Sequence, residues 1–132
     1  MRLAFAVLLA ALSTPAMADE ALNLELNTVK SVEGRCQLSY LIENKGDQAI
    51  ESFKLDLVVL GVDNIMQRRM VIDIAPLRAS KTMFRVYEID PDCDKIGAVL
   101  VNDVQACTPG DRPMCLDRLV LSSKVSAIRL FK

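Results

Sequence analysis

A short acidic run, EIDPDCD, is the stretch of this sequence whose spacing most resembles a metal site. Asp90, Asp92 and Asp94 are spaced like the first three ligands of a calcium-binding loop. The remainder of that pattern is missing, because Lys95 stands where such a loop needs glycine and Val101 where it needs a bidentate glutamate. The three aspartates are therefore a weak calcium candidate, and a solvated acidic turn is the favoured interpretation.

Four cysteines form the second group that could do chemistry. No Cys-x-x-Cys pair is present, so the spacing does not favour a redox-active thiol. Four cysteines in an exported chain favour two structural disulfides. With strands running up and down, the start of the second strand and the loop after the fifth lie at one pole. The end of the sixth and the start of the seventh lie at the other, which predicts the bridges Cys36–Cys93 and Cys107–Cys115.

Catalysis is disfavoured by what the composition lacks. The chain has no His and no Trp, so its serines have no imidazole to activate them. With five glycines and no phosphate-binding loop, no cofactor is expected either. A small hydrolase with converging carboxylates is kept as a second alternative. The net charge of −1 argues against nucleic-acid binding, which needs a basic surface.

Two further groups have a structural explanation. The adjacent Arg68 and Arg69 could receive an anionic partner, but protection of an edge strand is the favoured role. If Arg68 faces inward, it needs a carboxylate partner or a place at an edge. Thioether ligation of copper is disfavoured because the methionines of the mature chain are spaced as core and loop filling: Met66, Met70, Met83 and Met114.

The first eighteen residues have the layout of a secretory signal peptide. Arg2 precedes the apolar run LAFAVLLAAL, which is well short of the roughly 20 residues that span a bilayer. A small-x-small motif then predicts cleavage between Ala18 and Asp19. We therefore expect a periplasmic protein, with residues 19–132 as one domain and no stable membrane insertion after the leader is removed.

These groups would be carried on short strands of alternating polarity. Turn residues separate the strands about every ten positions, as is typical of a β-sandwich. Thr82, Phe84 and Val86 are predicted to face inward, and Asn102-Asp103 to form a bulge. The segment from Leu116 to Phe131 reads as strand, although its periodicity also allows a helix. The predicted strands cover residues 22–26, 36–42, 53–60, 70–74, 82–86 and 96–106. We predict an immunoglobulin-like β-sandwich of about seven antiparallel strands.

The order of several motifs resembles a known group of proteins. The segments are RCQLSYLIENKGDQAI, FKLDLVVLGVDN and IDIAPLRASKTMFRVYEI, with LNLELN before them and VLVNDVQAC and CLDRLVLSS after. Together they resemble small exported alphaproteobacterial proteins that carry an immunoglobulin-like module and are often labelled as Tat-pathway signal proteins. The resemblance implies no catalytic residues. A twin-arginine signal needs two arginines, and Arg2 stands alone, so the general secretion route is expected.

The functional hypothesis is a non-enzymatic periplasmic binding or adaptor module. It would contact an unidentified envelope protein through a sheet edge or loops, because strand addition needs no special side chains. The alternative is a periplasmic protein that binds a small ligand or a metal ion such as calcium, which requires a pocket with convergent polar groups.

Overall fold

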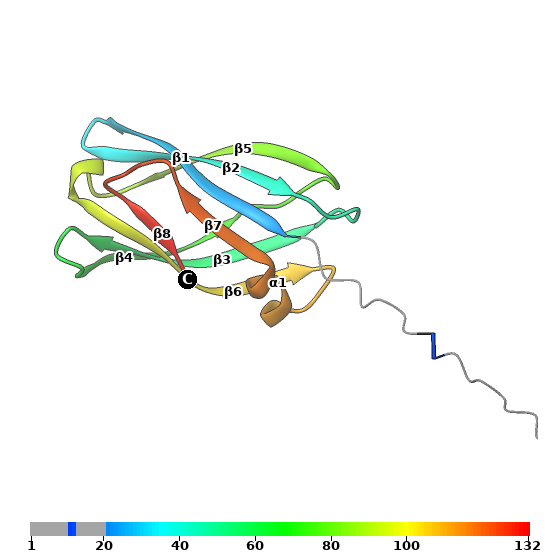
Figure 1. Cartoon of the computed structure of the whole chain (residues 1–132). Coiled ribbons are helices and arrows are strands. Elements are labelled where there is room, and N and C mark those ends of the chain that lie inside the picture. Colours follow the sequence, from blue (N-terminus) through cyan, green and yellow to red (C-terminus); the bar gives the residue numbers. More distant parts are fainter. Residues whose placement is uncertain (1–10, 13–20) are drawn as a thin grey trace, which may run out of the picture.

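The computed structural model describes residues 11–12 and 21–132 (Figure 1). The predicted cleavage between Ala18 and Asp19 lies outside the described residues, as does most of the leader. The described part of the chain folds as two four-stranded sheets packed face to face. This is an all-β sandwich, as the alternating strands predicted.

Each sheet combines strands from both halves of the chain. In order across the first sheet lie β5 (Lys81–Ile89), β2 (Arg35–Asn44), β1 (Leu22–Val32) and β7 (Leu119–Ser123). Across the second lie β4 (Met66–Asp73), β3 (Ser52–Gly61), β6 (Ile96–Thr108) and β8 (Arg129–Phe131). The 3-10 helix η1 (Cys93–Lys95) precedes β6, and the helix α1 (Arg112–Arg118) lies between β6 and β7.

The strand pairing is not wholly antiparallel. After β6, the chain passes through α1 into β7, which pairs with β1 in parallel. It then crosses to the second sheet, where β8 pairs with β6 in parallel. The prediction of antiparallel strands throughout was therefore wrong for these two pairs, and both sheets are mixed. Immunoglobulin sheets are antiparallel. The two parallel pairs therefore do not confirm the immunoglobulin-like topology, which stays a prediction.

The core lies between the sheets and is built by the period of two expected of strands. Along β1, Leu22, Leu24 and Leu26 are buried, while the residues between them are half-buried. Strand β3 is central and contributes the fully buried Phe53. The ring of Tyr40 meets that of Tyr87 edge to face at 6.0 Å, so aromatic and aliphatic side chains together fill the space.

Strand β6 is long and irregular where it pairs with β3. The register shifts between Asp56 and Leu57, which leaves Asn102 as the extra residue opposite them. The predicted bulge at Asn102-Asp103 is present. A bulge re-aims the side chain it carries, and here it directs the Asn102 amide towards Asp56.

The facing of β5 was predicted wrongly. Thr82, Phe84 and Val86 were expected to face inward, but all three are exposed on the outer face, Phe84 and Val86 by 55% and 48%. Tyr87 and Ile89 occupy the alternate positions that turn inward. The reason is that β5 lies at the edge of its sheet and has apolar residues on both faces, so alternation alone does not identify the buried set.

A short helix occupies part of the region whose secondary structure was ambiguous. Helix α1 begins after Asp111, whose side chain accepts a hydrogen bond from the Met114 amide, and it has Pro113 in its first turn. This cap and proline are a sequence signal for a helix start that periodicity did not register. The strands β7 and β8 that follow agree with the preference for strands over residues 116–131.

Candidate functional site

The three aspartates of the calcium candidate have separate structural roles. Asp90 lies between two arginines, with its carboxylate 3.4 Å from Arg35 Nε and 3.6 Å from Arg68 Nη1. The Asp92 side chain caps η1 by accepting from the Cys93 amide, and Asp94 is exposed. Among the described residues, no group of three or more His, Cys, Asp or Glu side chains is placed to hold a metal ion.

The two adjacent arginines lie on β4, which is the edge strand of the second sheet. Arg68 belongs to the inward-facing set with Met70 and Ile72, and it has the carboxylate partner that this orientation requires, Asp90. Arg69 turns outward and binds Asp56 through Nε at 3.0 Å and Nη2 at 2.8 Å.

Asp56 is a buried charge on the outer face of the second sheet. Its side chain is covered by Arg69 from β4 and Asn102 from β6, whose Nδ2 donates to Oδ2 at 2.8 Å. The hydrogen bonds from Arg69 are the main cause that lowers the pKa of Asp56 below its ordinary value; burial opposes this, and Asn102 adds to it. With both oxygens bonded, this carboxylate ties three strands together and is not available as a general base.

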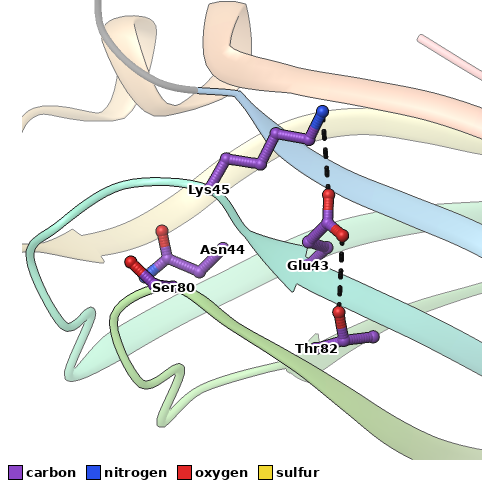
Figure 2. Close-up of a pocket in the computed structure, with 5 residues that line it drawn as sticks. All are labelled: Glu43, Asn44, Lys45, Ser80 and Thr82. Atoms are coloured by element: carbon purple, nitrogen blue, oxygen red, sulfur yellow. Dashed lines mark hydrogen bonds and ion pairs between the residues drawn. The ribbon is translucent and has the colours of Figure 1, made fainter.

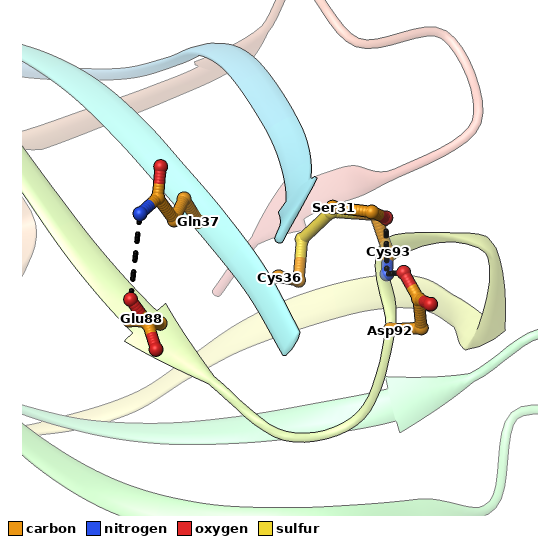
Figure 3. Close-up of a disulfide and its surroundings, with 6 residues drawn as sticks. All are labelled: Ser31, Cys36, Gln37, Glu88, Asp92 and Cys93. Atoms are coloured by element: carbon orange, nitrogen blue, oxygen red, sulfur yellow. Dashed lines mark hydrogen bonds between the residues drawn. A yellow bond between two sulfur atoms is a disulfide. The ribbon is translucent and has the colours of Figure 1, made fainter. Parts of the chain in front are cut away.

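Two disulfides brace opposite ends of the sandwich with the pairing expected from the strand order. Cys36–Cys93 joins the start of β2 to η1, and so connects the first sheet to the segment that enters β6 (Figure 3). The Cys93 amide also donates to Ser31 Oγ at the end of β1. Cys107–Cys115 joins the end of β6 to α1. No cysteine among residues 21–132 is free.

A hollow of about 400 Å³ opens where β2 ends and β5 begins (Figure 2). Its polar side chains have partners, either one another or the adjoining loop. Glu43 contacts Lys45 at 3.8 Å and Thr82 Oγ1 at 3.4 Å, while the buried Asn44 side chain bonds the Gln48 carbonyl and the Gly46 amide. A small-ligand site needs convergent polar groups that are free to bind the ligand. The polar groups that line this hollow already have partners.

From this hollow, an outward-facing surface runs along the paired strands β2 and β5. Leu41 lies opposite Phe84, and Ser39 lies opposite Val86. We call the unpaired side of strand β5, together with the exposed side chains of Phe84 and Val86, the β5 edge. Among the described residues, no helix is long and apolar enough to span a bilayer.

The β5 edge differs from the other sheet edges in length and in the regularity of its pairing. Strands β7 and β8 have five and three residues. Strand β4 has eight residues and a register irregularity, which disfavours pairing with another chain. Strand β5 has nine residues paired in continuous register with β2. An edge of this kind is a template for an added strand.

The β5 edge was not among the site residues predicted from the sequence. Phe84 and Val86 were predicted to lie in the core, so their exposure at the surface was not foreseen. The signal that could have found them is the presence of apolar residues in both parities of TMFRVYE, which fits a strand covered on one face and exposed at an edge. Comparisons with protein-family models, with curated proteins and with solved structures find no match to this chain.

Proposed function

We propose that this protein is a non-enzymatic binding module of the periplasm that captures an extended segment of an envelope protein along the β5 edge. The proposal rests chiefly on the exposure of Phe84 and Val86 on a nine-residue edge strand. An incoming strand would receive main-chain hydrogen bonds from β5, and its alternate side chains would meet these two residues.

The periplasmic location is part of the same proposal. It is supported by the leader pattern that ends at Ala18 and by two disulfides, which persist in oxidising compartments. The disulfides also brace both ends of the sandwich, so the strand that offers its edge is held on a stiff frame. A preformed edge lowers the ordering cost of binding.

Site-specific photocrosslinking in the periplasm tests the proposal. A photoreactive phenylalanine analogue replaces Val86 on the β5 edge, and in a matched variant it replaces Val120 on β7. The two valines are 48% and 52% exposed, and both lie on edge strands of the first sheet. We expect a discrete crosslinked envelope protein from position 86 and none from position 120.

A second pair of variants tests whether the apolar side chains matter. Replacing Phe84 by Lys should abolish the crosslink from position 86, because it places a charge where an apolar side chain must pack. Replacing Lys54, an exposed residue on the other sheet, by Glu should leave it unchanged. Equal capture from positions 86 and 120, or capture that survives the Phe84 change, would contradict the proposal.

A further inference from the structure

Arg85 sits in the middle of the β5 edge and bonds backbone instead of a carboxylate. Its Nη1 donates to the Phe84 carbonyl at 3.2 Å, and its Nη2 donates to the Pro76 carbonyl at 3.3 Å. The second contact reaches the segment that links β4 to β5. The guanidinium therefore lies beside the backbone of the strand that the proposed function would extend.

The other arginines on β2 and β4 have acidic partners. Arg35 contacts Glu88 and Asp90, Arg68 contacts Asp90, and Arg69 binds Asp56. Within the described residues, Arg85 forms no such ion pair. A half-buried guanidinium that bonds two neutral carbonyls retains the capacity for a carboxylate, which is its stronger partner.

The charges around Arg85 leave the beginning of β5 positive. Lys81 is exposed at that end of the strand and likewise forms no ion pair within residues 21–132. Of the nearby acids, Glu43 contacts Lys45 and Glu88 contacts Arg35, while the Asp73 carboxylate accepts from the Phe53 and Ala75 amides and offsets only one of the two positive charges. The net charge that an added strand would meet along the first half of β5 is therefore positive.

We propose that the segment captured at the β5 edge carries an acidic side chain opposite Arg85, flanked by apolar residues. This inference rests on the proposed function and specifies the chemistry of its partner. Directly opposed residues in an antiparallel pair have Cβ atoms about 5 Å apart, within reach of a carboxylate–guanidinium bond. Their neighbours project to the other face, where they meet Phe84 and Val86. The captured pattern is thus apolar, acidic, apolar.

Three synthetic peptides test the charge preference. They share the sequence Thr-Val-X-Val-Thr, with X as Glu, Gln or Lys, and both ends are blocked. Binding is followed by the amide resonances of Phe84, Arg85 and Val86 in isotope-labelled mature protein. We expect the Glu peptide to bind about fivefold more tightly than the Gln peptide, as befits a partly exposed ion pair, and the Lys peptide to bind most weakly.

Variants of Arg85 separate charge from strand pairing. In Arg85→Gln the difference between the Glu and Gln peptides should vanish while both still bind, and in Arg85→Glu the Lys peptide should bind best. Arg85→Lys keeps the charge but loses the planar fork, so it should retain a smaller preference for Glu. The dispersion of the amide spectrum shows whether each variant is folded. If Arg85→Gln or Arg85→Glu folds poorly, Arg85→Lys still tests the role of the guanidinium.

The outcomes distinguish this inference from the proposed function. Equal affinities for the three peptides, or a preference that persists in Arg85→Gln, would overturn the acidic partner while leaving strand addition at β5 intact. If the Glu peptide at millimolar concentration shifted none of the β5 amide resonances, the acidic partner would be overturned as well. The photocrosslinking from position 86 would still decide the proposed function. Shifts of the β5 amides on concentrating the protein alone would show that a second copy occupies the edge, which also overturns it.

Discussion

Asp56 illustrates how one residue can join three strands from the outer face of a sheet. Its side chain points away from the core, in the parity of Lys54 and Val58, yet its residue exposure is 2%. The cover comes from Arg69 and Asn102, which donate to both of its oxygens. A buried charge is tolerated only when it is paired and hydrogen-bonded in this way.

Replacing Asp56 by Asn should destabilise the protein by about 2 kcal/mol. The amide keeps the size of the side chain but turns one acceptor into a donor that faces donors from Arg69 and Asn102. Urea unfolding at neutral pH measures the change. The matched control is Asp47→Asn, an exposed carboxylate in the loop between β2 and β3, for which we expect no measurable change.

The same carboxylate should make the folded state sensitive to acid. Because the pKa of Asp56 is lowered in the folded protein, mainly by Arg69, the unfolded state binds a proton more readily. Its contribution to the free energy of unfolding is present above the unfolded pKa, near 4, and is lost as the pH falls through the folded value. Asp56→Asn should flatten the loss of stability below pH 4, whereas an unchanged acid slope would show that other carboxylates dominate.

The Asp56 network could be predicted only in part. The bulge at Asn102-Asp103 was visible as a polar interruption of an apolar run. The meeting of Asn102 and Arg69 at Asp56 could not be predicted. The register of three strands decides which residues meet, and no local pattern specifies that register. The sequence likewise placed Arg68 and Arg69 on opposite faces but did not identify Asp90 and Asp56 as their partners.

At the scale of elements, the close approach of β6 to the hairpin between β3 and β4 depends on a glycine. A Cβ built at Gly97 would lie 2.7 Å from the Gly61 carbonyl oxygen and 2.9 Å from Val62 Cα. Both are backbone atoms, so relief requires the strands to separate where the β3–β6 register already shifts. The absence of a side chain at position 97 is therefore a condition for this pairing.

Gly97→Ala should lower the free energy of unfolding by about 2 kcal/mol through overpacking. Gly61→Ala is the matched control, because its Cβ would meet the movable side-chain ends of Asp63 at 2.8 Å and Gln67 at 2.9 Å. Thermal unfolding of both variants should show a clearly smaller loss at position 61. Equal losses would mean that the backbone at β6 yields as easily as those side chains do.

Which elements could be predicted depends on how many of their faces are covered. The first half of β1, the whole of β2 and, apart from the buried Asp56, β3 alternate between buried and less buried positions, so their facing followed from the sequence. Edge strand β5 has apolar residues in both parities and was turned the wrong way. The parallel pairing of β7 and β8 depends on the route of the chain after α1, which is a long-range property that periodicity does not contain.

At the scale of the whole molecule, the two disulfides close loops of very different length. The cysteines of Cys36–Cys93 are separated by 57 positions and those of Cys107–Cys115 by 8. In the loop-closure account, the first bridge stabilises the folded state by about 4 kcal/mol and the second by about 2.5 kcal/mol. The first also links the first sheet to the segment entering the second, whereas the second anchors a single helix to the strand before it.

Removing each bridge separately should therefore give distinct results. Alanine replaces both cysteines of a pair, because Cys36 and Cys115 are buried and serine would bury a hydroxyl. We expect the pair Cys36→Ala and Cys93→Ala to lower the urea midpoint more than the pair Cys107→Ala and Cys115→Ala. In the second pair, faster hydrogen exchange should be confined to α1 and the end of β6, leaving β5 as protected as before. If both pairs lost the same stability, the length of the closed loop would not be what sets the contribution of each bridge.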